Sequence, residues 1–294
     1  MEPTVISQNL EDFINDLDKS LAWLKSLGMQ NTRFNRYRKA LETVLEHRIA
    51  GTLEKLTRIV PPEQYREAFI ESTHLVAIQK SLQRFKGPRF IQKLRVAVSG
   101  PVSPADEKSA GANARDFLFE LSTGALFRRR GIPVLIWADK DAVIRLSGCT
   151  LLVECKRPRS ENKVKHSIKD ATHQLIKHFG RYHRDMMPRG LIALDISLIT
   201  NPTRYVLTSD SIEAIRMELD AALERFIKNF GSALAYRRDK RILGVLVFLK
   251  VLGYHSLQSR HLNCEKLGLY VHAEPGSYEG ILADGLYRVL LPFK

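Results

Sequence analysis

Cysteine is scarce in this chain, and several patterns that mark common protein classes are missing. The three cysteines, Cys149, Cys155 and Cys264, are odd in number and lack Cys-x-x-Cys spacing. This argues for a reducing compartment and against structural zinc. The sequence has no Gly-x-x-x-x-Gly-Lys-Ser/Thr loop, no Gly-x-Gly-x-x-Gly turn and no Gly-x-Ser-x-Gly elbow. These absences exclude the motif-bearing P-loop hydrolases, dinucleotide enzymes and serine hydrolases.

Long apolar runs are also missing. None reaches the roughly 18–20 residues that a membrane span requires. The longest, residues 242–252, is interrupted by Lys250 and is better interpreted as a core strand. The N-terminal segment is acidic and amphipathic, with Glu11 and Asp12 among its acids, so we expect no signal peptide. The expectation is a cytoplasmic protein without membrane contact.

Positive charge, by contrast, is abundant. Lys and Arg number 46 against 32 Asp and Glu, which gives a formal net charge of +14. Such an excess favours polyanionic partners. The cations gather in residues 80–95, 157–169 and 237–241. We interpret the third group as a solvated surface, whereas the second directly follows the most informative motif of the chain.

That motif lies in residues 150–158. Three apolar residues, Leu151 to Val153, run into Glu154-Cys155-Lys156, and Pro158 ends the segment. The pattern predicts a buried strand in which Glu154 and Lys156 face the same way, because side chains two positions apart share a face. Burying such charges costs several kcal/mol unless they are paired or bind a metal.

A second strand is expected just upstream. Asp141 precedes the apolar run Ala142-Val143-Ile144, and Ser147-Gly148 predicts a turn back into the Glu-x-Lys strand. Asp139 competes with Asp141 for the position of the first acid. We prefer Asp141 because the apolar run follows it directly; Asp139 is then an outer ligand or a turn residue.

An acid followed by a hairpin and Glu-x-Lys can supply the metal ligands and the ammonium group that metal-dependent cleavage of a phosphodiester requires. A hard cation polarises the phosphoryl oxygen and activates water. Mg²⁺, or Mn²⁺ in its place, takes oxygen ligands and keeps several waters, so one or two carboxylates suffice. Asp141 and Glu154 can supply carboxylate oxygens, and Cys155 a carbonyl oxygen. Lys156 would hold or deprotonate the water, or stabilise charge on the phosphate.

Asp141 followed by Glu154-Cys155-Lys156 resembles the PD-(D/E)xK superfamily of restriction-endonuclease-like nucleases, over about residues 90–200. In that superfamily the helix ahead of the hairpin often carries an extra acid, and the helix after it a glutamine. The resemblance implies these assisting roles for Glu120 and Gln174. The alternative for Glu120 is a salt bridge to Arg115 or Arg128, and for Gln174 a solvated helix position.

The resemblance also implies a fold and a reaction. The fold is α/β, with a restriction-endonuclease-like mixed sheet flanked by helices and preceded by an α-helical region. The reaction is Mg²⁺-dependent hydrolysis of nucleic acid, with DNA favoured over RNA and an endonuclease over an exonuclease, in restriction, repair or defence against foreign DNA. Phosphate contacts are expected from the cations near the motif. These are Arg157, Arg159, Lys163, Lys165, Lys177 and Arg181.

Periodicity divides the chain into two expected domains. Residues 1–88 are expected to form a helical domain that docks on DNA, forms a homodimer or binds a partner protein, and residues 89–294 the nuclease-like domain. Further helices are expected over 166–183 and 210–230, and strands over 190–199, near 242–249 and 267–273, and near 287–292. Within the first of these strands, Asp195 is expected to be a hydrogen-bonded structural acid.

Two other functions remain open from the sequence alone. The first alternative to a nuclease is a catalytically silent nucleic-acid-binding module that keeps the fold. The second is a structural or regulatory subunit of a larger complex. The intact Asp141, Glu154 and Lys156 argue against the silent module.

Overall fold

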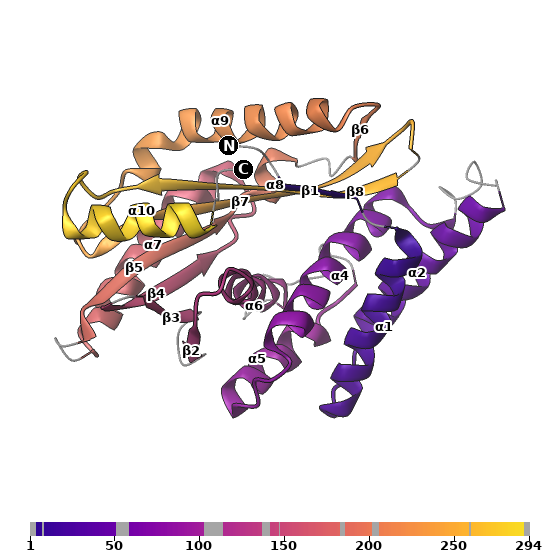
Figure 1. Ribbon diagram of the computed structural model, residues 1–294, viewed down its shortest axis with the longest axis horizontal. Helices are drawn as coiled ribbons and strands as arrows, with labels where there is room; N and C mark the ends of the chain where they lie inside the picture. Colours follow the sequence, from indigo (N-terminus) through magenta and orange to yellow (C-terminus); the bar gives the residue numbers. More distant parts are fainter. Residues whose placement is uncertain are drawn as a thin grey trace.

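The computed structural model describes residues 4–7, 9–50, 59–102, 114–136, 142–146, 148–182, 186–201, 206–258 and 260–290. Over these residues the protein is α/β, with a group of helices from the first third of the chain beside a mixed sheet (Figure 1). The helices are α1 (Leu10–Ser26), α2 (Thr32–Ile49), α4 (Pro62–Leu82), α5 (Pro88–Ser99), α6 (Ala114–Arg129), α7 (Glu161–Phe179), α8 (Ser197–Thr200), α9 (Ile212–Leu234) and α10 (Tyr278–Leu290). The strands are β1 (Thr4–Ser7), β2 (Val134–Ile136), β3 (Ala142–Leu146), β4 (Cys149–Lys156), β5 (Pro188–Asp195), β6 (Leu207–Ser209), β7 (Ile242–His255) and β8 (Arg260–Val271).

The sheet has the order β1-β8-β7-β5-β4-β3-β2, and β6 pairs with the far end of β7. Strands β2, β3 and β4 are antiparallel neighbours, whereas β4, β5 and β7 run parallel. The expected hairpin is confirmed, since β3 and β4 pair with Leu146 opposite Cys149. Gly148 in the turn has φ 77°, a left-handed conformation that glycine adopts without strain. Helix α7 makes the long crossover that a parallel β4–β5 pair requires.

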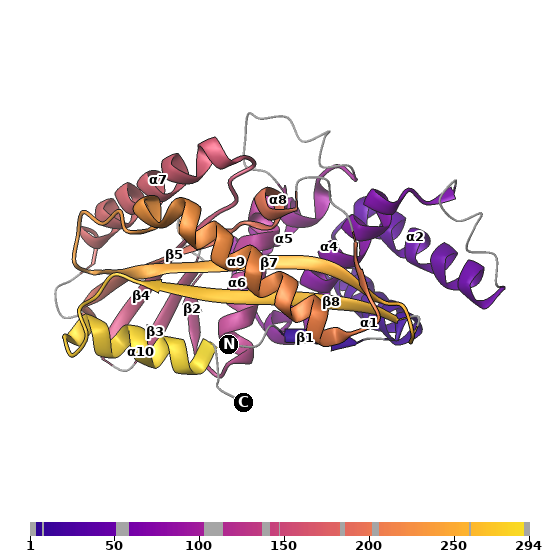
Figure 2. The same ribbon diagram turned by 90° about the horizontal axis from the view of Figure 1, so that it is seen from above.

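Helices cover both faces of the sheet. Figure 1 shows α9 above the long strands and α6 below them, and Figure 2 shows α9 lying across β7 and β8. Alternate residues of each strand enter different cores, as the pleat requires. In β4, Leu152 joins the cluster under α7 and α9, whereas Leu151 and Val153 join the cluster that contains α6. The absence of apolar/polar alternation in β4 therefore reflects burial on both faces.

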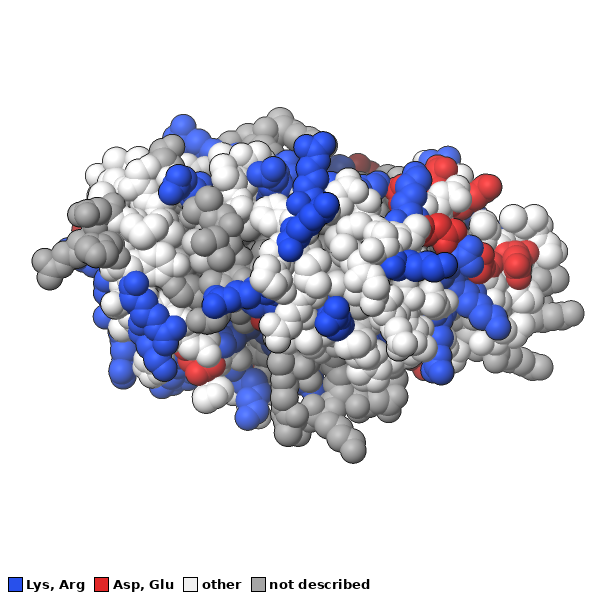
Figure 3. Space-filling model, turned by 90° about the horizontal axis from the view of Figure 1, so that it is seen from below, with Lys and Arg blue, Asp and Glu red and all other residues white. Residues whose placement is uncertain are grey.

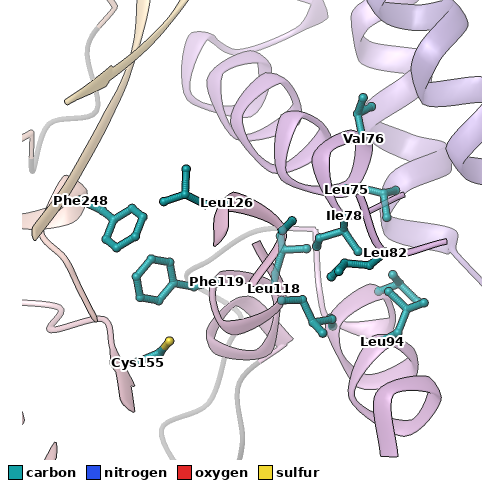
Figure 4. Packing of buried hydrophobic residues seen from close by; sticks show 14 of the residues in the cluster. Leu75, Val76, Ile78, Leu82, Leu94, Leu118, Phe119, Leu126, Cys155 and Phe248 are labelled. Atoms are coloured by element: carbon teal, nitrogen blue, oxygen red, sulfur yellow. The ribbon is translucent and has the colours of Figure 1, made fainter. Parts of the chain in front are cut away.

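Helix α6 joins the sheet to the helices from the first third of the chain. Figure 4 shows Phe119 pointing toward Phe248 of β7, and Leu118 pointing toward Ile78 and Leu82 of α4. The Phe119 and Phe248 rings are 5.1 Å apart and nearly perpendicular, at 89°. All these side chains belong to one buried apolar cluster that extends from α1 to the sheet. The division at residue 88 stays a prediction.

Buried ion pairs reinforce this junction. Glu71 of α4 accepts from Nε of Arg115 on α6, at 2.5 Å, and lies 3.4 Å from Nε of Arg33 on α2. All three side chains are at most 5% exposed. A buried carboxylate without such partners would be costly, so the two guanidinium groups account for Glu71 at this position.

Three expectations about local structure were wrong. Residues Thr4–Ser7, expected to be helical, form β1 along β8. The strand expected near 287–292 is helix α10 up to Leu290, because Leu282, Leu286 and Leu290 repeat at helical spacing and Ser277 caps the helix at Gly280. The strands expected near 242–249 and 267–273 are longer than expected, since β7 and β8 run over Ile242–His255 and Arg260–Val271 and pair as one hairpin. The helices of the described residues include none that is long and apolar enough to cross a bilayer.

Candidate functional site

Glu154 and Lys156 share one face of β4, as their spacing predicts, and both contact helix α7 on that face. β5 pairs with β4 as far as Lys156. The antiparallel strand β3 begins at Ala142, which lies opposite Val153. The last three residues of β4 therefore extend past the described part of β3. Because a groove lies at this end of the strand, the two charged side chains are near solvent without being on an open surface.

Glu154 is deeply placed for a carboxylate, at 4% exposure. Its Oε1 lies 3.3 Å from Nε2 of His178 on α7, and the side chains are 6% and 12% exposed. An imidazole at this distance compensates part of the cost of removing a carboxylate from water. The pair orients the Glu154 carboxylate toward the groove that both residues line.

Lys156 makes two contacts to the same helix. Its Nζ donates to Oε1 of Gln174 at 2.6 Å and lies 3.1 Å from Oδ2 of Asp170. The lysine side chain is 19% exposed. Asp170, Gln174 and His178 follow one another at intervals of four residues, so they lie on one side of α7. The adjoining side of this helix is apolar and packs on the sheet through Ile168 and Leu175.

Glu120 reaches the groove from α6. It accepts a 2.7 Å hydrogen bond from Nζ of Lys93 on α5, and both side chains are about one-eighth exposed, at 12% and 13%. Lys93 is thus a partner of Glu120 among the described residues, whereas the sequence suggested Arg115 or Arg128. Phe117, one turn earlier on α6, also lines the groove and has the Lys93 ammonium 5.6 Å from its ring centre.

One groove of about 660 Å³ contains these groups. Of the five side chains with a predicted catalytic role, Glu120, Glu154, Lys156 and Gln174 line it together. Its described lining is Asp116, Phe117, Glu120, Glu154, Cys155, Lys156, Arg157, Ser167, Gln174, Lys177, His178 and Arg181. Four residues to which the sequence assigned a catalytic role, from α6, β4 and α7, therefore line the same groove.

Asp141 and Asp139 lie outside the described residues, so the choice between them stays a prediction. Cys155, expected to offer its carbonyl oxygen, lines the groove and is paired in register with Ala193 of β5. Within the described ranges no three His, Cys, Asp or Glu side chains form a group that could hold a metal ion. Glu154 and Cys155 remain the described residues that the sequence assigns to a metal.

The six cations expected to contact phosphate fall into three classes. Lys177 and Arg181 line the groove and are exposed. A second class, exposed but outside the described groove lining, consists of Arg159, Lys163 and Lys165. Arg157 differs from both, because Nε donates to Oδ2 of Asp195 at 2.9 Å and Nη1 lies 3.6 Å from Oδ1 of Asp116.

Asp195 is a hydrogen-bonded structural acid, as expected. Its Oδ1 accepts from the backbone N–H and the hydroxyl of Ser197, at 3.0 and 2.6 Å. Burial alone raises the pKa of Asp195, but the Arg157 guanidinium and the Ser197 hydrogen bonds outweigh it and hold the pKa below its usual range.

Sequence reasoning missed the roles of Asp170, His178 and Lys93. The first two had a local signal, since each is four residues from Gln174 and must share its helix face. The contact between Lys93 and Glu120 had no local signal in the sequence, because it joins residues 27 positions apart on different helices.

No family model matches this chain, and neither curated proteins nor solved structures include a match to it.

Proposed function

We propose that this protein is a divalent-metal-dependent phosphodiesterase that hydrolyses nucleic acid, with DNA favoured over RNA and internal cleavage over end-directed cleavage. The observation that carries the proposal is the convergence of Glu154 and Lys156 with Glu120 and Gln174 in one groove. A carboxylate beside an ammonium, both near solvent and both oriented by a helix, is a combination suited to water activation.

The succession of elements supports a restriction-endonuclease-like fold. A helix with an acid, α6, precedes the β3–β4 hairpin, and a helix with a glutamine, α7, leads into the core strand β5. This is the order that the resemblance to PD-(D/E)xK nucleases implies for Glu120, Glu154-Cys155-Lys156 and Gln174. The parallel β4–β5 pair places α7 over the Glu-x-Lys end of β4.

The donor set fits a hard divalent ion. Glu154 offers carboxylate oxygens in the groove, and the Cys155 carbonyl and the Asp141 carboxylate are further oxygens from the motif. These residues would hold Mg²⁺ or Mn²⁺, with Asp141 assigned from the sequence. When bound, such an ion polarises a phosphoryl oxygen and lowers the pKa of a coordinated water.

The chain's own groups have separate tasks in this scheme. The Lys156 ammonium, held by Gln174 and Asp170, is placed to orient water or to balance charge on the phosphate. His178 orients the Glu154 carboxylate. Lys93 compensates the charge of Glu120, so that this acid can lie in the groove beside a polyanion.

Surface charge supports a nucleic-acid substrate. Figure 3 shows a face on which Lys and Arg are spread widely, whereas most of the acidic side chains visible there gather toward the right-hand end. Independently of that view, Lys177 and Arg181 are two cations in the lining of the groove itself. Such contacts give affinity that is sensitive to salt and largely independent of base sequence.

Cleavage of labelled single-stranded and duplex DNA and RNA oligonucleotides, with Mg²⁺ or Mn²⁺, tests the proposal. Wild type should cut at least one of them, and Asp141→Asn, Glu154→Gln and Lys156→Met should each abolish or strongly reduce the rate. Glu213→Gln is the matched control, since this carboxylate is 73% exposed on α9, away from the groove lining.

Binding without cleavage separates the rival function. If wild type binds the oligonucleotides but none is cut in either metal, the chain is a silent binding module. If wild type and the three site variants cut at equal rates, the activity belongs to a contaminant or to another site. Either result overturns the proposal.

A further inference from the structure

Arg157 lies between the candidate groove and a second, smaller cavity of about 40 Å³ on the other face of the sheet. It lines both cavities. Its neighbour Lys156 faces α7, whereas Arg157 contacts Asp116 of α6 and lines the second cavity beside α4. The second cavity is lined by titratable residues of those helices, including Glu71, His74 and Arg115.

The guanidinium of Arg157 joins the ends of three elements. It pairs with Asp195, the last residue of β5, and with Asp116 in the first turn of α6. Asp195 in turn binds Ser197, whose hydroxyl accepts from the backbone N–H of Lys250 on β7 at 2.9 Å. One continuous chain of contacts therefore runs from β7 through β5 and β4 to α6.

Both members of the central pair are charged in the folded protein. Burial lowers the pKa of Arg157, but the nearby Asp195 and Asp116 carboxylates raise it above its usual value. The Arg157 side chain is 16% exposed and that of Asp195 is 9% exposed. A phosphate that approached Arg157 would have to compete with two carboxylates already in contact with it. That competition argues against the phosphate contact expected from the sequence.

The contacts of Arg157 fix two of the elements that carry groove residues. Asp116 and Glu120 are four residues apart on α6, so a contact to Asp116 fixes the turn that carries Glu120. Arg157 directly follows Lys156, so the same guanidinium fixes the end of the strand that carries Glu154 and Lys156. Planar Arg can reach two acids from one side chain, which a Lys ammonium does less well.

We infer that Arg157 is a positioning residue: with Asp195 and Asp116 it holds the Glu154–Lys156 end of β4 against α6, and it does not contact the substrate. This inference rests on the proposed function and adds a residue to it. It assigns the phosphate contacts in the groove to Lys177 and Arg181 instead.

Two measurements on the full chain test the inference. The first is kcat and KM for the oligonucleotide that wild type cuts best. The second is the salt dependence of binding to the same oligonucleotide in EDTA, from 50 to 200 mM salt. Arg157→Gln should lower kcat about 10–100-fold, the usual range for residues that orient a metal site's ligands. Its KM and its salt slope should match wild type.

Partner variants sharpen the test. Asp195→Asn should lower kcat to a similar extent, and the double variant should lose little more, because both changes break one pair. Lys177→Gln is the positive control for a phosphate contact and should reduce the salt slope by about 0.9 on duplex DNA. Arg288→Gln, at a guanidinium 71% exposed on α10, should leave both measurements unchanged.

The outcomes are distinguishable. An Arg157→Gln protein with unchanged kcat, or with a salt slope reduced by about one, overturns the positioning role while the proposed function stands. If circular dichroism shows Arg157→Gln unfolded, Arg157→Lys and Asp195→Asn decide the question by the same criteria. A wild type that cuts no oligonucleotide overturns the proposed function, and the positioning role falls with it.

Discussion

Nζ of Lys156 on β4 donates a 2.6 Å hydrogen bond to Oε1 of Gln174, which lies 18 residues later on α7. The contact ties the orientation of the ammonium to the position of the helix that covers this face of the strand's end. A long lysine side chain otherwise samples many rotamers, and an acceptor of fixed position reduces that freedom. The ammonium is thereby preorganised before any ligand arrives.

Replacement of Gln174 by Leu should therefore lower kcat about 10- to 150-fold, since a hydrogen bond to a charged group contributes about 1.5–3 kcal/mol. KM should change little, because the lost acceptor orients Lys156 rather than the substrate. Steady-state kinetics on the best oligonucleotide measure both constants. His173→Leu is the control, an exposed position on the same helix. A tenfold rise in KM with constant kcat would contradict this role for Gln174.

Glu154→Gln should remove divalent-ion binding while it leaves the fold intact. The amide keeps the size of the side chain and can still meet His178, but it lacks the charge that a hard cation requires. Isothermal titration of Mn²⁺ into wild type, stripped of metal with EDTA and then dialysed free of it, should give a binding curve that Glu154→Gln lacks. Glu161→Gln, at an exposed acid in the first turn of α7, is the control. Equal Mn²⁺ binding by both variants would show that Glu154 is not a ligand.

Phe119→Ala should destabilise the protein by about 3–5 kcal/mol, the usual cost of truncating a buried aromatic side chain. Phe119 is 1% exposed and stacks edge-on against Phe248, so neighbouring residues cannot easily refill the space. Urea unfolding at pH 7 measures the change. Ile281→Ala on α10, at a side chain 63% exposed, should stay within about 0.5 kcal/mol of wild type. A cost for Phe119→Ala below 1 kcal/mol would show that α6 does not join the two parts of the fold.

Protonation of His261 should lower the free energy of unfolding in mild acid. Burial, with a contribution from Arg48, lowers the pKa of His261 from 6.5 to about 4. The fold thus favours the neutral ring, so this stabilisation is present above pH 6.5 and is lost as the pH falls toward 4. One pKa unit corresponds to about 1.4 kcal/mol, so His261 should account for about 2–3 kcal/mol between pH 7.5 and 4.5.

The measurement is urea unfolding of wild type and His261→Gln across that pH range. The variant should lose less stability than wild type on acidification, by the amount given above. His261 packs against the rings of Tyr65 and Tyr254, with centroids 4.9 and 5.0 Å away, so the variant will also be less stable at neutral pH. Parallel pH profiles for the two proteins would show that His261 does not titrate differently on folding.

Local patterns account for what the sequence predicted well. The β3–β4 hairpin follows from an apolar run, a glycine turn and a second apolar run, all within 15 residues, since each depends only on neighbours in the chain. The groove face of α7 follows from helical spacing around Gln174. The short apolar run near Leu290 was predicted to be a strand, but it is the end of helix α10, because a short apolar run alone does not distinguish the two.

Contacts between distant residues account for what was missed. Arg157 was expected to bind phosphate because it follows the motif in a basic stretch, and nothing local indicated that Asp195 and Asp116 would meet it. Lys93 belongs to the basic stretch of residues 80–95, and nothing in that stretch indicated that its ammonium would pair with Glu120. Such pairings depend on how α5, α6 and the sheet pack, which composition and periodicity do not encode.

Strand β1 closes one margin of the sheet, because its four residues pair with Leu262 to Glu265 of β8. Without them, that row of backbone N–H and C=O groups would be open to a strand from another molecule. A shortened protein that starts after Ser7 is therefore expected to self-associate during purification even if its groove is intact. Affinity tags for biochemical work are better placed where they do not pull on this strand.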